Sequence, residues 1–457
     1  MARIFISFFD GIVDLNNPKA MSCHYESLLT EFKNAGNDIL YFDHKIWGKD
    51  FGKPPKNFLN QLKKFNPDLI ILFDNRCYDI SKHFDCPIII WEADSCLYFS
   101  NKEEIKKNPN RFHYIVGQTV LVPKIKELFG ITSNNVHYLS SVTSTISEDL
   151  PQTTNISFIG TKFHTPDMIS EFMHTKPSNK EVEIFKKMLC YVEKYPFTTE
   201  EEIFKKIKTN STNIKDKFSV KSAIAVLSVK NRIQILSMAA DLGLDLYGNE
   251  SWIDGLLHEP DLALSYKNKL IYTQKQNQDI YNSSKISINI NHAQAQTGFS
   301  WRVCDIMASN ACLVTQHKKD LEDLFPKIKI PMFSNKYEAY EICKKLLRED
   351  NMRKDIVNSC QEAIDKNFRY SHLFKKLEQI FGIIFITNNL GNIARLSLKN
   401  ESIDENGKIK FRANTRVNLL LLSTMMIINQ IPIINKPLMS RDQILDKIEN
   451  VIKNDKK

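Results

Sequence analysis

The sequence has none of the short motifs by which several common classes of protein hold metals or nucleic acids. Its nine cysteines, an odd number, occur without Cys-x-x-Cys spacing. In a chain this long they indicate reduced, mostly buried thiols of a cytosolic protein, and neither a disulfide framework nor a zinc site. There is no Asp-x-Asp motif, no zinc-finger or RNP signature and no internal repeat, so nucleic acid is disfavoured as a partner.

A signal-like segment is also missing, because residues 1–9 read directly as a first strand. We therefore expect a cytoplasmic protein, with peripheral contact at the inner face of the membrane as an open alternative. The 62 basic and 53 acidic residues give a net charge of +9, spread along lysine-rich stretches. That excess fits attraction to an anionic substrate or an anionic membrane face. The 457 residues suffice for two substantial domains with extra elements.

Short apolar runs alternate with helical segments through the first 145 residues. The run 68–73 is unbroken, which is typical of a parallel strand covered on both faces. The alternation predicts an open parallel sheet with helices on both sides, a Rossmann-like domain over residues 1–145. The predicted strands are 3–9, 38–42, 68–73, 87–91, 114–117 and 136–139.

Carboxylates follow several of these strands, namely Asp10, Asp74, Glu92 and Asp94. Ligands bind at the carboxyl ends of the strands in such sheets. Asp94 comes just after a strand and is the best candidate for taking a proton from an attacking hydroxyl group. An alternative of equal weight is that the carboxylate caps the next helix, together with Ser95.

A second doubly wound domain is predicted over residues 153–370, after a polar linker. Its first strand runs into Gly160 and Thr161. A glycine there lets the backbone approach a phosphate, and the threonine adds a hydroxyl group. Lys162 and His164 are placed to add charge or hydrogen bonds to the same site. The alternative is a plain tight turn.

Three segments stand apart from the sheet pattern. Residues 174–229 have helical spacing and predict an inserted helical segment, which shapes a cleft, contacts a partner or is simply solvated. A helix over 232–242 follows. Residues 371–457 read as C-terminal helices and an extension. Within them the apolar run 417–434 is short for a membrane span, so we expect a buried helix, with peripheral membrane docking as the minority alternative.

A βαβ unit is predicted in the second domain, with a strand at 286–290, a polar loop, a helix near 300–309 and a further strand. Gly298 and Ser300 lie where this helix begins. A helix start offers free amide N–H groups and a partial positive charge, which suit a phosphate. Arg302 adds a full charge and a two-pronged contact, and Asp305 lies one turn further along the same face.

This unit resembles the C-terminal half of GT-B glycosyltransferases, most closely the CgeB-like group of the "glycosyl transferases group 1" superfamily. The group's Arg-Val-x-Glu-x-x-Ala-x-Gly pattern corresponds to residues 302–310, and its Asp-Leu-x-x-Leu-Phe pattern to residues 320–325. Asp305 stands where the group has Glu, and Asn310 where it has Gly. The resemblance covers residues 155–382, while the first half matches only in architecture.

The resemblance implies an α/β protein of the GT-B fold, with two doubly wound Rossmann-like domains facing a cleft, a helical insertion and a C-terminal helical extension. It implies a metal-independent glycosyltransferase that moves a sugar from a nucleotide-activated donor to a glycan or lipid-linked acceptor, without a cofactor, in bacterial surface polysaccharide, lipopolysaccharide or glycoconjugate synthesis. The donor is a UDP- or GDP-sugar, or a CMP-linked acidic sugar such as Kdo; the absence of a His-Pro dipeptide counts mildly against the last.

The resemblance also distributes the candidate residues over the two domains. It implies an acceptor site formed by Asp10, Glu92 and Asp94. The donor would be bound by Gly160, Thr161, Lys162, His164, Tyr247, Gly248, His292, Gly298, Ser300 and Arg302. The catalytic candidates are Asp94, Arg302 and Asp305. His292 has an alternative role in binding backbone, and a non-catalytic binding or scaffold protein of an envelope-assembly complex is the second hypothesis for the whole chain.

Overall fold

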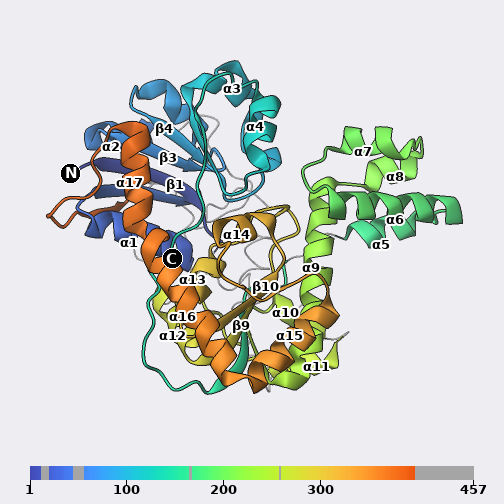
Figure 1. Ribbon diagram of the computed structural model, residues 1–457. Helices are drawn as coiled ribbons and strands as arrows, with labels where there is room; N and C mark the ends of the chain where they lie inside the picture. The colour runs from blue at the N-terminus through green and yellow to red at the C-terminus, as the bar shows by residue number, and fades with distance from the viewer. Residues whose placement is uncertain (12–19, 45–55, 164–166, 257–258, 397–457) are drawn as a thin grey trace, which may run out of the picture. The chain divides into compact units, whose positions relative to one another are not determined.

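The computed structural model describes residues 1–11, 20–44, 56–163, 167–256 and 259–396. His164 and the apolar run 417–434, both singled out in the sequence, lie outside the described residues. Within the described ranges the chain forms two parallel sheets, each covered by helices (Figure 1).

The first sheet has seven strands in the order β12-β2-β1-β3-β4-β5-β6, all parallel. Every strand predicted in the first domain is present, and β3 is buried along its whole length, as its unbroken apolar run predicts. The strands are β1 Arg3–Phe9, β2 Asp38–His44, β3 Leu69–Phe73, β4 Ile88–Trp91, β5 His113–Val116, β6 Val136–Tyr138 and β12 Ile393–Arg395. The edge strand β12 comes from the far end of the described chain and has no counterpart among the predicted strands.

Helices follow the strands of this sheet, as expected for a doubly wound domain. The first one ends at Asn34, and Gly36 just beyond it adopts a left-handed φ of 97° that a glycine adopts without strain. The helical elements are α1 Cys23–Asn34, α2 Lys56–Phe65, η1 Tyr78–His83, η2 Cys96–Tyr98, α3 Lys102–Lys107, η3 Pro109–Arg111 and α4 Leu121–Phe129.

The second sheet has five parallel strands in the order β11-β10-β9-β7-β8. They are β7 Thr154–Ile159, β8 Leu244–Tyr247, β9 Ser284–Asn289, β10 Cys312–Gln316 and β11 Met332–Phe333. Its helices are η4 Ala240–Leu242, α10 Ser251–Leu256, α11 Pro260–Ser265, α12 Gln274–Asn282, α13 Arg302–Met307, α14 Lys319–Leu324, α15 Lys336–Arg348 and α16 Asp350–Asn367. The predicted fold class, two doubly wound domains with a helical insertion, is confirmed.

The insertion between β7 and β8 consists of α5 Met168–His174, α6 Asn179–Lys194, α7 Glu200–Ile207, α8 Thr212–Lys217 and the long α9 Val220–Ala239. Apolar side chains from all five form a core of their own. The predicted helical insertion is present, but the predicted break between residue 229 and a new helix at 232 was wrong, because α9 runs through it. Residues 220–239 contain neither glycine nor proline, so nothing interrupts the helix.

Residues Val220–Leu242, α9 with η4, are long and apolar enough to cross a bilayer by length and composition alone. Half of this stretch is buried inside the protein, which is the pattern of a core helix as well. Ser228 and Arg232 on this helix are both buried and bond to loops of the second domain.

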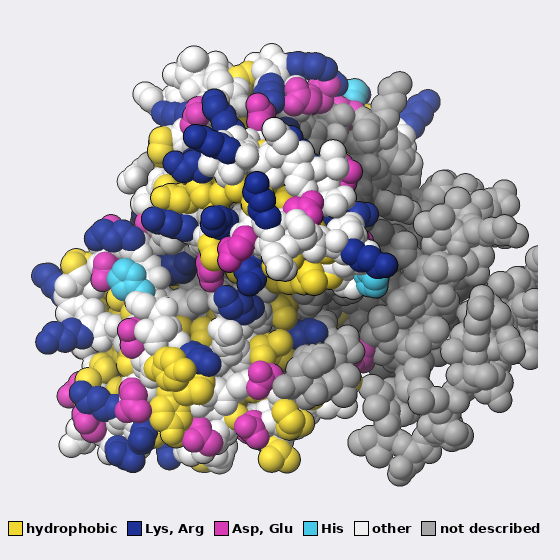
Figure 2. Space-filling model, turned by 90° about the vertical axis from the view of Figure 1, so that its right-hand side faces the viewer, with side chains coloured by type: hydrophobic (Ala, Val, Ile, Leu, Met, Phe, Trp, Pro, Cys, Tyr) yellow, Lys and Arg dark blue, Asp and Glu magenta, His cyan; other side chains and the backbone are white. Residues whose placement is uncertain are grey.

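The last helix among the described residues, α17 Tyr370–Phe381, returns to the first sheet (Figure 1). Phe374 is buried and its ring stacks on that of Phe32 in α1, with 4.6 Å between centroids. Charged side chains of both signs are mixed over the face shown in Figure 2, in line with a basic excess spread along the chain.

Candidate active site

The turn after β3 brings three carboxylates of the first domain together. Asp74, Asn75 and Cys77 all adopt left-handed φ values, from 52° to 64°. This conformation is uncommon outside glycine and is frequent at functional sites. It places Asp74 Oδ1 to accept the backbone N–H groups of Ala93 at 2.9 Å and Asp94 at 3.0 Å. The turn after β3 therefore holds the turn after β4.

Burial changes the charge of this cluster. Burial, followed by the nearby charge of Asp94, raises the pKa of Asp74 to about 8. Burial likewise raises the pKa of Glu92 to about 8, although Glu92 accepts a hydrogen bond from Gly117 N–H at 3.0 Å. At neutral pH both side chains keep their protons, and Asp94 is the member of the group placed to act as a base.

The raised pKa of Asp74 has a consequence for stability. A carboxyl group that binds its proton more tightly when folded makes the free energy of unfolding fall as the pH rises from about 4 to about 8. Asparagine can accept the same two N–H bonds and carries no charge. We expect Asp74→Asn to melt a few degrees above the native protein at pH 8, and with no difference at pH 4.

Calorimetry across this pH range checks the prediction, with Asp216→Asn, an exposed position on α8, as the control. A lower melting temperature for Asp74→Asn at pH 8 would show that the buried carboxyl is ionised and held by partners.

Asp94 and Ser95 take different roles in the structure. The Ser95 hydroxyl caps η2 by accepting the Leu97 N–H at 3.3 Å. Asp94 does not cap this element; its Oδ1 accepts a hydrogen bond from Gln294 Nε2 of the second domain at 3.0 Å. Asp10, in contrast, is buried and accepts the Ser22 N–H at 2.7 Å just before α1. The structure thus gives Asp10 a role in holding α1, which differs from the predicted acceptor contact.

Two arginines lie at the carboxyl ends of the second sheet. Arg232 on α9 is buried, donates to the carbonyls of Thr161 and Ile290, and lies 3.8 Å over the ring of Phe163. Its Nε has no hydrogen-bond partner. Burial, followed by the charge of Arg302, holds the pKa of Arg232 well below its usual range.

Arg302, in the first turn of α13, is partly buried and lies 5.0 Å from the ring of Trp301. Burial, followed by the charge of Arg302, lowers the pKa of His24 in α1 to about 4, so Arg302 lies near elements of both domains. In the described part of the chain no carboxylate forms an ion pair with Arg232 or Arg302. Burial raises the pKa of Asp305 whereas the charge of Arg302 lowers it, so a carboxylate is nearby, but it forms no ion pair with either arginine. Two guanidinium groups that form no ion pair favour binding of an anion.

The Gly160–Thr161 turn lies beside this pair. Gly160 N–H donates to Tyr247 O at 3.0 Å, and Gly160 O accepts from Trp252 Nε1 at 2.8 Å. A Cβ added at Gly248 would come within 2.3 Å of Gly160 O. Gly248 is therefore needed for the packing of one turn against the other. Lys162 is buried, and its backbone N–H donates to Ser251 Oγ at 3.2 Å.

The amide groups predicted to hold a phosphate are already occupied. Gly298 N–H donates to Gln118 Oε1 at 3.2 Å, and Ser300 N–H donates to Asn291 Oδ1 at 2.9 Å. The Ser300 hydroxyl donates to Asn289 Oδ1 at 2.8 Å. The prediction that these N–H groups face a ligand was wrong, because they donate to side-chain oxygens of the protein itself.

Asp305 is also placed differently from the prediction. It is buried, and its Oδ1 accepts from the Thr143 hydroxyl at 2.5 Å and from the Thr145 hydroxyl at 3.5 Å. Burial raises its pKa to about 6, against the lowering effect of Thr143. The carboxylate thus fixes the linker to α13, which corrects its assignment as a residue that contacts a sugar or ribose hydroxyl.

His292 occupies the loop before α13, edge-on to Phe163 with 4.8 Å between ring centroids. Burial lowers its pKa to about 4, while the charge of Asp94 acts in the opposite direction. A neutral imidazole between Arg232 and Asp94 can donate or accept a hydrogen bond at the boundary of the two domains. Its Nδ1 accepts from Gln294 N–H at 3.4 Å, in line with the predicted backbone contact.

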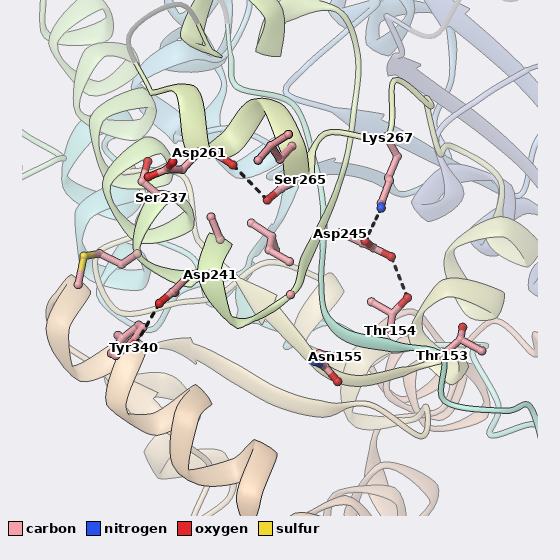
Figure 3. A pocket seen from close by; sticks show the side chains of 15 residues that line it. Thr153, Thr154, Asn155, Ser237, Asp241, Asp245, Asp261, Ser265, Lys267 and Tyr340 are labelled. Carbon is pink, nitrogen blue, oxygen red and sulfur yellow. Dashed lines mark hydrogen bonds and ion pairs between the residues drawn. The ribbon is translucent and has the colours of Figure 1, made fainter.

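A pocket of about 820 Å³ lies elsewhere, beside the first residues of β7 and β8 (Figure 3). Two of its carboxylates have partners within the pocket: Lys267 Nζ lies 2.7 Å from Asp245, and Tyr340 donates to Asp241 at 3.2 Å. It is at the amino ends of the strands, whereas open α/β sheets bind ligands at the carboxyl ends. We therefore place the site at the two arginines. No cluster of three or more potential metal ligands occurs among the described residues.

Sequence reasoning found Arg302 and Asp94 but missed three residues that the fold brings beside them. Arg232 appeared only as the start of a helix, and Gln118 and Gln294 did not stand out at all. Arg232 carried little signal of its own, because Lys230, Asn231 and Gln234 stand beside it in the same helix and its burial is a property of the fold. The two glutamines carry no signal, because their partners lie about 180 and 200 positions away in the chain.

Comparison with known proteins adds the family context. The sequence profile of a family described as "Glycosyl transferase-like" matches residues 232–379, about a third of the chain. No curated protein sequence matches significantly. The sucrose-phosphate synthase of Thermosynechococcus elongatus is similar in structure, with a TM-score of 0.51 and 10% identity over 84% of this chain and 98% of the other.

The Anabaena protein HepE, solved in complex with UDP and glucose, gives a TM-score of 0.50 with 9% identity over 84% of this chain and all of the other. Identities this low show a shared fold and nothing finer. The chain therefore has the two-domain GT-B fold of glycosyltransferases, and its residues 232–379 match the glycosyl transferase-like family.

Proposed function

We propose that this protein transfers a sugar from a nucleotide-activated donor to an acceptor held by the first domain. The observation that carries this proposal is the pair Arg232 and Arg302, two guanidinium groups that form no ion pair in the described structure, at the carboxyl ends of the second sheet. When the bond between sugar and phosphate breaks, the electron pair leaves with the phosphate. Two guanidinium groups nearby stabilise that charge.

Asp94 supports the other half of the reaction. It is partly buried, lies near His292, and belongs to a cluster whose other carboxyl groups stay protonated at neutral pH. In the proposed reaction the acceptor hydroxyl oxygen attacks the anomeric carbon, and its proton passes to Asp94. Closure of the domains excludes water, so that transfer is favoured over hydrolysis.

We propose a UDP-sugar as the donor, supported by the structural likeness to HepE, which was solved with UDP and glucose. A GDP-sugar and a CMP-linked acidic sugar such as Kdo are the alternatives. We further propose that transfer is independent of metal ions, because the arginine pair supplies the positive charge that a metal would otherwise bring.

The wider role that we propose is surface polysaccharide, lipopolysaccharide or glycoconjugate synthesis in a bacterial cytoplasm, on a glycan or lipid-linked acceptor and with peripheral contact at the membrane. This rests on the resemblance of residues 302–310 to the CgeB-like group and on the net charge of +9.

Titration calorimetry with UDP, GDP and CMP tests the donor assignment. We expect one of the three to bind, and Arg302→Ala to weaken that binding about ten- to a hundredfold, the value of one hydrogen-bonded charge pair that is partly exposed. Arg348→Ala, at an exposed position of α15, is the matched control and should bind as the native protein does. Binding of none of the three would contradict the proposal and favour a non-catalytic scaffold.

A further inference from the structure

We infer that Gln294 is a positioning residue that orients Asp94 for proton removal, and does so only while the donor loop, residues 292–298 of the second domain, is docked against the first domain. The inference rests on the proposed function, since it assigns Asp94 as the base. It adds a residue and a mode of control that neither the sequence nor the comparisons contain.

The side-chain amide of Gln294 contacts the Asp94–Ser95 turn at two points. Its Nε2 donates to Asp94 Oδ1 at 3.0 Å, and its Oε1 accepts the Ser95 N–H at 3.1 Å. One contact fixes the carboxylate and the other fixes the backbone beside it. Within the described chain the Asp94 carboxylate accepts no other hydrogen bond, so its orientation depends on a residue of the opposite domain.

Gln294 is itself held in place by the donor loop. The preceding residue, Ala293, donates its N–H to Ser228 Oγ on α9 at 2.9 Å. The following residue, Ala295, donates its N–H to His292 O at 2.9 Å. His292 lies close enough to Arg232 for the arginine charge to lower its pKa. The loop thus connects the proposed phosphate site to Asp94 through a short run of residues.

A second contact docks the other end of the same loop. Gln118 Oε1 accepts three successive backbone N–H groups, from Gln296 at 2.8 Å and from Thr297 and Gly298 at 3.2 Å each. A Cβ at Gly298 would lie 2.6 Å from Gly117 O, so only glycine allows this approach. An uncharged carboxamide in a group of three N–H donors forms a contact that can separate without leaving a buried charge.

Asp320 of α14 reinforces the docking. It accepts the Thr119 N–H at 2.9 Å from the first domain and the Thr297 hydroxyl at 3.1 Å from the donor loop. When the domains part, these contacts and both bonds of Gln294 break together. Asp94 then loses the partner that orients it, so a hydroxyl group or water that arrives before closure is poorly activated.

Gln294→Ala and Gln296→Ala form a matched pair, because Gln296 is exposed in the same loop and only its backbone bonds to Gln118. Hydrogen exchange of the peptide around Ser95 reads the contact without any assay of activity. We expect this peptide to exchange at least tenfold faster in Gln294→Ala than in the native protein. In Gln296→Ala its exchange rate should be unchanged. Equal exchange in the two variants would overturn the inference.

Kinetics separate a positioning role from a merely structural one. We expect Gln294→Ala to lower kcat for transfer about ten- to a hundredfold, while the Kd for the nucleotide changes less than twofold. Gln294→Glu keeps the bond to Ser95 N–H and places a negative charge beside Asp94. Like charges raise the pKa of a carboxyl, so the acid limb of the rate profile should move up by about one pH unit.

The outcomes distinguish this inference from the proposed function. A native protein that binds no nucleotide and transfers no sugar refutes the function, and the inference falls with it. A native protein that is active while Gln294→Ala matches it in kcat and in pH profile refutes the inference alone. A loss of nucleotide affinity in Gln294→Ala would make Gln294 a donor ligand and would likewise overturn its assignment as a positioning residue.

Discussion

Replacement of Asp94 by asparagine is expected to lower the rate of sugar transfer by about a hundred- to ten-thousandfold, the range spanned by general bases. Asparagine keeps the shape of the side chain and can still accept the hydrogen bond from Gln294. It cannot take a proton from the acceptor hydroxyl group. The rate is measured as nucleotide release in the presence of acceptor, and the Kd for the nucleotide should not change.

Glu92→Gln is the matched control for this variant. Glu92 belongs to the same cluster, but its pKa of about 8 means that it is already protonated at neutral pH. A neutral glutamine should therefore change the rate little. If Glu92→Gln is the damaging variant and Asp94→Asn is not, the base is Glu92 and the assignment must be exchanged.

Replacement of Arg232 by methionine is expected to weaken nucleotide binding by about a hundred- to ten-thousandfold, the loss of two charge-assisted hydrogen bonds in a buried site. The effect should exceed that of Arg302→Ala because Arg232 is buried and Arg302 is partly exposed. Methionine fills a similar volume, and without ligand it removes a buried charge that has no counterion. The melting temperature of the free protein should therefore stay level or rise.

Arg353 offers the contrast for this prediction. It is as deeply buried on α16, but it forms an ion pair with Asp350 at 2.5 Å and donates to Leu346 O at 2.9 Å. Arg353→Met should lower the melting temperature, because it removes one partner of an established pair, and should leave nucleotide affinity unchanged. A fall in stability without loss of binding in Arg232→Met would show that Arg232 serves the fold alone.

Much of the fold could be predicted from the sequence, because its signals are local. An unbroken run such as residues 68–73 has few alternatives to a buried parallel strand, and β3 is found there. The elements that were missed depend on distant partners. The strand β12 is a strand only because Asn392 O and Leu396 N–H bond to β2, and three residues in isolation carry too little pattern to show it.

The candidate site was predicted in part for the same reason. Arg302 follows from its place in the first turn of a helix after a strand. Which amide groups stay free was not predictable, because Gln118 reaches Gly298 across the domain boundary. The sequence likewise suggested that Asp305 was available to bind a ligand. Nothing near Asp305 in the sequence indicates that the Thr143 hydroxyl would donate to it.

The seven-stranded sheet has a consequence for how the protein is assembled. Its edge strand and the helix that covers α1 come from residues 370–395, after the whole second domain has been made. In sequence, the second domain is therefore inserted between two segments that both belong to the first domain. During synthesis the first domain cannot complete its core before residues 370–395 are made, because Phe32 still lacks its contact with Phe374. The second domain can fold before that point. The part that is made first is thus the part that is finished last.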